Sequence, residues 1–290
     1  MNEYYRSKAV MESESFDSDL ALERRRASTY VEGVDYKRDV CLGGVWERLK
    51  VTGEAGERSI GRPAGLYDTL TVPRMDNITP DDISDATDEV ARELCRMCDL
   101  CDILPQRILV VGLGNRDLTP DAIGPASARE VEATMHVKEM DRELFESLDC
   151  SEICVLCPDV TANSGMNAAS IVKGVCDYVK PDVVLAIDSL ASRSIERLGT
   201  TVQVSSTGIF PGTGLGHSGY AINEELLGVP VIAIGIPTVI SSRALAKEAG
   251  GHAGTSNELF VAPKGINRIV KNAAKIVGGG INQAFGMCFF

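Results

Sequence analysis

Two aspartates, each following an apolar run, are the residues of this chain best suited to chemistry. Asp188 directly follows five apolar residues, 183–187, which predict a buried strand. Asp121 follows the apolar run 108–111, after a loop that begins at Gly112. Ligands bind at the carboxyl ends of the strands in open parallel sheets. If the two strands are neighbours, both carboxylates face one cleft.

A pair of nearby carboxylates has a defined chemistry. Two such groups cannot both ionise cheaply, so one of them keeps a proton near neutral pH. The ionised group can take a proton from water, while the protonated group donates to a carbonyl oxygen. We therefore predict that Asp121 and Asp188 are catalytic and hydrolyse an amide bond, with no cofactor and no metal. The alternative for each aspartate is a helix N-cap or a turn residue.

Two further polar residues follow the same strands. Asn115 lies in the loop after the first strand, and Arg193 lies five residues after Asp188. We expect them to bind substrate or to stabilise developing negative charge. A structural hydrogen bond or salt bridge is the alternative for both. His217 lies near the predicted site and could add a third polar group.

Other motifs give weaker indications. Gly112-x-Gly114 is not a dinucleotide fingerprint, because Asp117 occupies the third glycine position. The two C-x-x-C pairs, at 95–98 and 154–157, fall in an expected helix and an expected strand. Zinc sites usually use tight turns, so we expect these cysteines to pack in the core.

Composition limits the class of protein. The chain has 290 residues, 44% of them hydrophobic, and a net charge of −12. This charge argues against a general affinity for nucleic acids or anionic membranes. No uncharged apolar run reaches the roughly 18 residues of a membrane-spanning helix. Nine cysteines without a secretory signal indicate an intracellular protein with reduced thiols.

Apolar strands alternating with helices predict the α/β class, with a mostly parallel twisted sheet covered by helices on both faces. A smaller β-containing segment, near residues 45–72, precedes this core. Thr79 and Pro80 indicate a helix start, with the helix running to about Cys101. Residues 1–20 are expected to be a pro-segment or mobile arm, and 21–290 a single domain. Its core spans 104–240, and its C-terminal helix spans about 264–284.

Long ordered segments of the sequence resemble the spore germination protease family. The segments are 112–115, 119–125, 180–182, 186–197, 207–209, 211–214 and 228–238. Together they cover about residues 104–240. Weaker similarity appears at Asp19-Leu20-Ala21, at 60–70 and in the C-terminal helix.

The resemblance implies an endopeptidase that degrades small acid-soluble spore proteins early in germination. It implies a zymogen that loses a short N-terminal segment, a homotetramer, and a location in the cytoplasm of the spore core. The family's two essential aspartates fall on Asp121 and Asp188. The implied fold is similar to that of hydrogenase maturation peptidases, in which acidic residues at equivalent strand ends bind nickel.

Four departures from the family pattern leave alternatives open. Asp17-Ser18 stands where Arg-Thr is usual, and Phe210 stands where a histidine is common. The loop 157–167 matches poorly, and 241–258 is shorter than the corresponding insertion. The alternatives are a metal-dependent maturation peptidase using Asp121, Asp188 and His217, or an inactive binding protein on the same scaffold.

Overall fold

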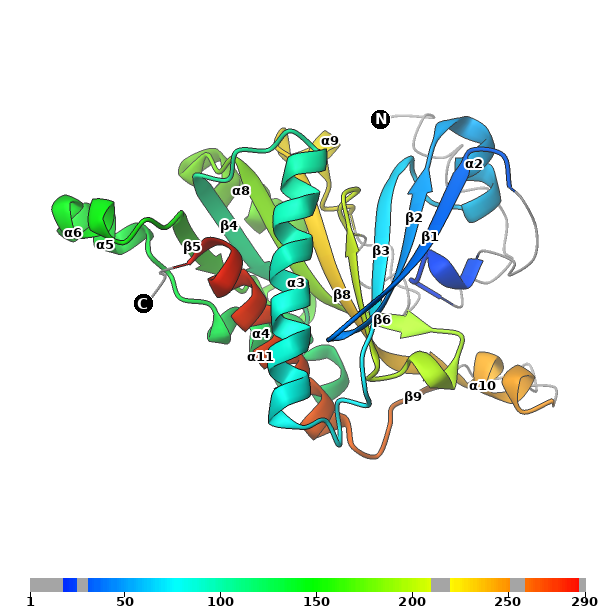
Figure 1. The fold of residues 1–290 in the computed structure, drawn as a ribbon. Helices are drawn as coiled ribbons and strands as arrows, with labels where there is room; N and C mark the ends of the chain where they lie inside the picture. Colours follow the sequence, from blue (N-terminus) through cyan, green and yellow to red (C-terminus); the bar gives the residue numbers. More distant parts are fainter. Residues whose placement is uncertain (1–17, 25–30, 210–219, 251–258, 287–290) are drawn as a thin grey trace.

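A computed structural model describes residues 18–24, 31–209, 220–250 and 259–286 of the chain (Figure 1). In this part of the chain nine strands form one sheet, ordered β1-β2-β3-β7-β8-β6-β4-β5, with β9 paired to β8. The strands are β1 Val34–Cys41, β2 Gly44–Val51, β3 Gly65–Thr71, β4 Arg107–Gly112, β5 Glu152–Leu156, β6 Val183–Ser192, β7 Thr201–Ser205, β8 Val231–Ser241 and β9 Phe260–Val261.

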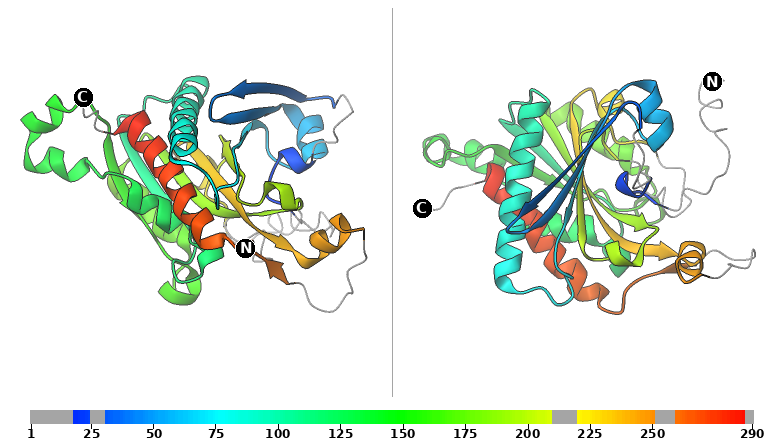
Figure 2. Two further views of the ribbon diagram at one scale, coloured as in Figure 1. Left: turned by 60° about the horizontal axis from the view of Figure 1, so that its bottom comes forward. Right: turned by 45° about the vertical axis from the view of Figure 1, so that its right-hand side comes forward.

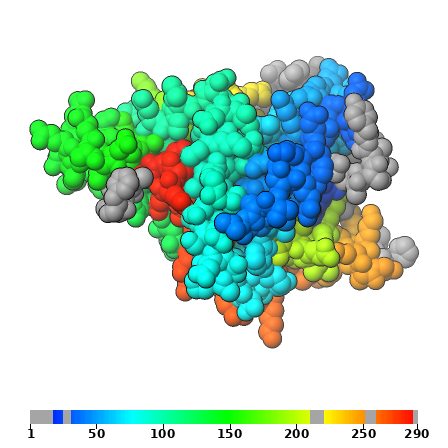
Figure 3. All heavy atoms as spheres, in the orientation of Figure 1, coloured from blue at the N-terminus to red at the C-terminus, as the bar shows by residue number. Residues whose placement is uncertain are grey.

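Helices of very different length connect these strands. They are η1 Leu22–Arg24, α2 Gly53–Ile60, α3 Pro80–Leu100, η2 Thr119–Asp121, α4 Ile123–Glu130, α5 Met135–Met140, α6 Arg142–Ser147, α7 Thr161–Ser164, α8 Ala168–Val179, η3 Ile195–Arg197, α9 Glu224–Leu227, α10 Ser242–Glu248 and α11 Ile266–Phe285. The short helices α5 and α6 project from one end of the molecule as an arm (Figure 3). Among the described helices, none is both long and apolar enough to cross a membrane.

The central strands β5, β4, β6 and β8 run parallel and carry helices on both faces (Figures 1 and 2). Alternate side chains of these strands enter two separate cores. Val110 and Leu185 pack under α3, α4 and α11, whereas Leu109 and Val184 pack with α8 and α9 on the opposite face. Strands buried on both sides need apolar residues at nearly every position. The predicted α/β class and the two covered faces are confirmed.

Parallel pairing is confined to this central part. The sequence predicts a mostly parallel sheet, but β1, β2, β3 and β7 extend it with antiparallel pairs. The reason lies in the connections. Only residues 193–200 join β6 to β7, and parallel crossovers need a dozen or more residues. The hairpin between β1 and β2 is shorter still, so the sheet as a whole is mixed.

The predicted long helix is confirmed as α3. The Thr79 hydroxyl accepts a hydrogen bond from the Asp82 N–H at 3.2 Å, and the Asp82 carboxylate accepts one from the Thr79 N–H at 3.2 Å. This capping box satisfies two N–H groups that the helix itself cannot pair. Pro80 occupies the first turn, where its missing N–H has no cost. The predicted C-terminal helix is likewise present as α11.

Strand β6 is longer than the sequence predicts. The apolar run ends at Ile187, yet the strand continues to Ser192, because β8 also continues past its own apolar run and pairs with it. Backbone hydrogen bonds hold this extension, whatever the polarity of the side chains. Asp188 therefore lies inside a strand instead of at its tip.

A close contact joins α4 to the end of β4 and to the middle of β6. A Cβ at Gly124 would lie 2.1 Å from the Leu113 carbonyl oxygen and 2.5 Å from that of Ile187. These are backbone atoms at the point where each strand leads into Asp121 or Asp188. Only glycine lets α4 pack this closely, and the packing fixes both segments.

We predict that Gly124→Ala lowers the free energy of unfolding by about 1–3 kcal/mol, because the methyl group must push α4 away from the sheet. Gly174→Ala on α8 is the matched control, since a Cβ at this position would meet nothing within 4 Å. Its expected effect is a gain of roughly 0.5–1 kcal/mol. Urea unfolding measures both, and equal effects in the two variants would contradict the contact.

Candidate functional site

The loop after β4 holds Asp121 by its backbone. Asp121 ends the single turn η2, and its Oδ2 accepts a hydrogen bond from the Asn115 N–H at 2.7 Å. Gly114 makes this closure possible: its φ is +107°, and a Cβ there would lie 2.1 Å from the Asp121 carbonyl oxygen. The Asp121 side chain is only partly exposed. Its carboxylate is therefore fixed in place by a donor that favours the ionised form.

Asp188 occupies a more buried position, with 5% of its surface exposed. It pairs with Gly235 of β8, and its Oδ1 accepts a hydrogen bond from the Ser189 N–H at 2.8 Å. Alternation along β6 places Asp188 on the same face as Val184 and Ala186, which belong to the core beneath α8. A carboxylate in such surroundings loses most of its hydration.

Electrostatics couple the two aspartates. Burial raises the pKa of Asp188 well above its usual range, and the negative charges of Asp121 and Asp19 raise it further. Burial also raises the pKa of Asp121, although the Asn115 N–H opposes this rise. Because the repulsion acts on the more buried group, Asp188 is the one that favours the proton. Such a pair titrates as a unit.

Asn115 contributes to the site through its backbone. Its N–H binds Asp121, while its side-chain Oδ1 accepts a hydrogen bond from the Asp117 N–H at 2.9 Å. The side chain therefore shapes the loop. A role for it in binding substrate stays a prediction.

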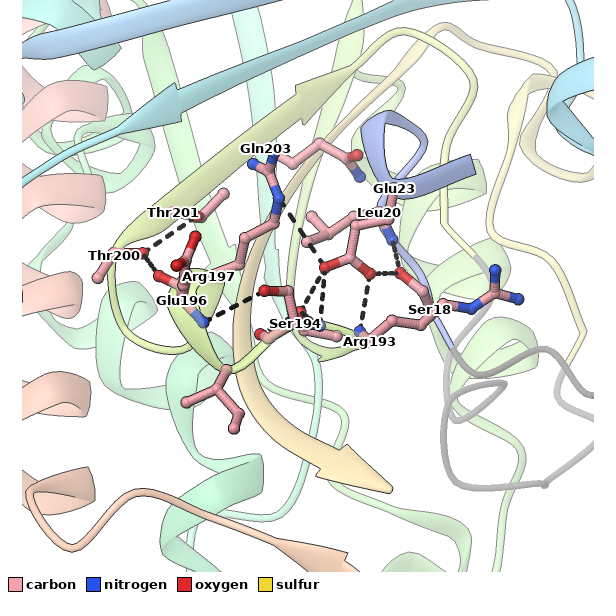
Figure 4. Close-up of polar contacts among 12 residues, drawn as sticks. Ser18, Leu20, Glu23, Arg193, Ser194, Glu196, Arg197, Thr200, Thr201 and Gln203 are labelled. Atoms are coloured by element: carbon pink, nitrogen blue, oxygen red, sulfur yellow. Dashed lines mark hydrogen bonds and ion pairs between the residues drawn. The ribbon is translucent and has the colours of Figure 1, made fainter. Parts of the chain in front are cut away.

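Arg193 lies away from the aspartates. It follows the end of β6, and an extended chain of five residues spans roughly 16 Å from Asp188. Its backbone N–H donates to Glu23 Oε2 at 2.7 Å (Figure 4). The structure brings Asp121 and Asp188 together with Asn115 but places Arg193 in a different cluster. Substrate binding by Arg193 also stays a prediction.

That second cluster is centred on the buried carboxylate of Glu23 in η1. It accepts hydrogen bonds from the Ser192 hydroxyl at 2.6 Å and from the Ser194 N–H at 3.2 Å, besides the Arg193 N–H. The Ser18 hydroxyl also donates to it, and Arg197 Nε lies 3.9 Å away. Figure 4 shows these contacts converging on one side chain. They tie the N-terminal part of the described chain to the end of β6.

A cavity is lined by Leu190 of β6 and by Gly235, the register partner of Asp188, but Asp188 itself is not part of its lining. Sequence reasoning did not assign its polar wall to the site. The polar residues are Asp19, Arg62, Tyr67, Gln203, Ser205 and Thr207. The available signal was the weak family similarity at Asp19-Leu20-Ala21 and at 60–70, the range that contains Arg62 and Tyr67. Nothing local in the sequence indicates that Arg62 and Gln203 line one cavity with Gly235.

The expected core packing of the two C-x-x-C pairs is wrong for two of the four cysteines: Cys95 and Cys157 are exposed, Cys154 is half-buried and only Cys98 is buried. Cys98 is buried, and burial raises the pKa of its thiol to about 12. Within the described ranges, no group of three histidine, cysteine or acidic side chains is placed to hold a metal ion. His217 and Phe210 lie outside the described residues.

Comparisons with known proteins agree with the sequence resemblance. A family model described as germination protease matches residues 10–253. The germination protease of Caldanaerobacter subterraneus subsp. tengcongensis is 36% identical over 92% of this chain and 93% of its own length. That of Clostridium perfringens strain ATCC 13124 is 32% identical over 92% of this chain and 94% of its own length.

Among solved structures, the [NiFe] hydrogenase maturation protease HycI from Thermococcus kodakarensis KOD1 is 17% identical, with a TM-score of 0.34. The match covers 63% of this chain and 99% of HycI. The family match and the relatives together give the identity: this chain belongs to the germination protease family, and it is a protease.

Proposed function

We propose that this protein is an endopeptidase that degrades small acid-soluble spore proteins during germination, using Asp121 and Asp188 to activate water. The observation that carries the proposal is the pair itself: a buried carboxyl whose pKa is raised by its surroundings and by a second carboxylate nearby. Two groups with different environments divide the roles of acid and base. Family membership supports a protein substrate.

The surroundings of Asp121 and Asp188 indicate which of them acts as the base and which as the acid. Asp121 accepts a hydrogen bond from the Asn115 N–H and is the less buried of the two aspartates. It is therefore the ionised base that takes a proton from water. Asp188 keeps the proton and donates it to the oxygen of the scissile carbonyl. Water adds to the carbonyl carbon and gives a neutral gem-diol. When its C–N bond breaks, the proton held by Asp121 passes to the leaving amine and one hydroxyl returns its proton to Asp188. No covalent bond to the protein forms.

The proposal includes the state of the protein in the cell. As in the family, the chain is made as a zymogen, loses a short N-terminal segment and acts as a homotetramer in the cytoplasm of the spore core. Ser18 and Leu20 are fully buried. Removal of the expected pro-segment, residues 1–20, would therefore take buried side chains away from the end of β6.

We predict that Asp121→Asn and Asp188→Asn each lower kcat/KM for a small acid-soluble spore protein at least about 1,000-fold, because an amide can neither hold nor donate the transferred proton. Asp117→Asn is the matched control, since Asp117 lies in the same loop with 76% of its side chain exposed. Circular dichroism checks the fold of all three. Full activity in either catalytic variant, with the control unchanged, would refute the mechanism.

The dependence of stability on pH gives a second prediction. The pKa of Asp188 is higher in the folded than in the unfolded chain, so the folded state binds more protons and loses stability as pH rises above about 3.9. Asp188→Asn removes this contribution. Its unfolding free energy should fall less steeply than that of the parent as pH rises from 4. Chemical unfolding across this range measures the slopes, and parallel curves would argue against a buried carboxyl with raised pKa.

The metal-dependent alternative is separated by a chelator. If Asp121 and Asp188 act directly on water, peptidase activity is expected to be unchanged after incubation with EDTA and gel filtration. Elemental analysis of the same sample reports any metal that remains. Loss of activity that zinc or nickel restores would favour a metal-dependent peptidase at this site.

A further inference from the structure

Strand β1 forms an outer edge of the sheet. Among the described residues, β2 is the one strand paired with it, from Val34 opposite Val51 to Cys41 opposite Gly44. Figure 1 shows β1 at the border of the sheet, and Figure 3 shows its side chains on the surface of the molecule. An edge strand presents a row of backbone donors and acceptors that another strand can pair with. With eight residues, β1 is long enough to serve as such a template.

The pairing with β2 decides which backbone groups of β1 point outward. The Thr52 N–H donates to the Gly33 carbonyl, which lies opposite to it, at 2.7 Å at the start of the β1–β2 ladder. In an antiparallel ladder, hydrogen-bonded pairs alternate with non-hydrogen-bonded pairs. The odd positions 35, 37, 39 and 41 therefore bond to β2. The N–H and C=O groups of the even positions point away from it.

A second copy of β1 can pair with this edge across a two-fold axis. Such an interface uses the same surface on both copies, and the two strands run antiparallel. Because the even positions carry the outward backbone groups, an even position of one copy must lie opposite an even position of the other. The axis then passes through a residue, and Tyr36, Lys37 and Arg38 are the central positions of the strand.

Two of these three axes meet an obstacle. An axis through Lys37 would place Lys37 opposite itself and Asp35 opposite Asp39, and like charges in these positions repel. An axis one residue earlier would require the Val34 N–H, which already donates to the Val31 carbonyl at 3.1 Å. The axis through the following residue remains.

An axis through Arg38 pairs opposite charges on one face of β1. Lys37 then lies opposite Asp39 of the second copy, and symmetry repeats this pair. These positions are non-hydrogen-bonded, so their side chains approach closely. The two side chains are 73% and 36% exposed in the single chain. Asp35, Lys37, Arg38 and Asp39 sum to zero charge, so this edge adds no repulsion to that of two chains of net charge −12.

The same axis covers apolar side chains on the other face of β1. Val40, which is 76% exposed, lies opposite Tyr36 of the second copy. Leu42, which is 87% exposed, lies opposite Val34 in the continued register. The two Arg38 side chains meet at the axis, where they are exposed and water screens their charges. Exposed apolar area and alternating charge thus select the same register.

We propose that β1 is the surface through which two copies of this chain associate, with a two-fold axis at Arg38 and one continuous sheet across both copies. The proposal rests on the homo-oligomer of the proposed function and names one of its interfaces. A tetramer in which all the axes are two-fold has at least two kinds of interface, so loss of this one leaves dimers.

Arg38→Pro tests the backbone pairing in the full chain. Proline removes the N–H at the axis, which points away from β2, and edge strands tolerate proline at such a position. Arg38→Ala is the matched control, because it loses the same side chain and keeps the N–H. In analytical ultracentrifugation, the parent and Arg38→Ala are expected in the same assembly, and Arg38→Pro in a species of half the mass. Circular dichroism checks the fold of both variants.

A charge exchange tests the register. Lys37→Asp places like charges opposite each other at two points of the interface, so association should weaken at least about tenfold. The double variant Lys37→Asp with Asp39→Lys restores opposite charges at both points and should restore the association of the parent. Lys173→Asp is the control: it makes the same charge change and removes the exposed pair with Asp177 on α8, and its association should equal that of the parent.

Cleavage of a small acid-soluble spore protein, measured on the same samples, separates this proposal from the proposed function. Assembly that is lost in Arg38→Pro and Lys37→Asp and regained in the double variant supports the β1 interface even if no cleavage is found. An assembled parent whose two variants assemble equally well overturns the interface and leaves the homo-oligomer in place. A monomeric parent overturns both the interface and the homo-oligomer, whether or not it cleaves.

Discussion

The repulsion between two carboxylates in a poorly hydrated place is the interaction on which this account depends. In water, two such groups would ionise and separate. Here the backbone prevents separation: Asp188 is part of β6, and Asp121 is held by the Asn115 N–H. In the mechanism that we propose, one carboxyl retains a proton, which relieves the unfavourable charge and gives the state that acid–base hydrolysis requires. The fold therefore holds the carboxyl groups of Asp121 and Asp188 in fixed positions near each other.

Several distant parts of the chain maintain that constraint. Gly124 lets α4 approach the end of β4 and the middle of β6, and Gly235 leaves space for the side chain of Leu190, two residues after Asp188. The N-terminal segment contributes Asp19 and Glu23, which bind the last residues of β6. A site assembled in this way depends on tertiary packing throughout the sheet. Its residues are contributed by elements more than a hundred positions apart.

The central part of this arrangement could be predicted from the sequence because its signals are local. The apolar runs before Asp121 and Asp188 identify two strands, which the structure shows to be parallel neighbours, and Thr79 with Pro80 identifies the start of α3. The extension of β6 to Ser192 could not be predicted, since it depends on backbone pairing with β8. The approach of Asp19 and Arg62 to the cavity depends on long-range contacts that leave no periodic pattern. Arg193 was selected because it follows Asp188 closely along the chain. In the structure its backbone N–H binds Glu23, and substrate binding by Arg193 stays a prediction.

The most direct measurement of the central claim is the protonation of Asp188 at neutral pH. Infrared spectra with carbon-13-labelled aspartate report protonated carboxyl groups by their C=O stretch, and the label excludes Glu93, whose own pKa burial raises to about 7. The parent protein is expected to show a protonated aspartate band that is absent from Asp188→Asn and weaker in Asp121→Asn. A parent spectrum with no such band, indistinguishable from that of Asp188→Asn, would contradict the shared proton on which the mechanism rests.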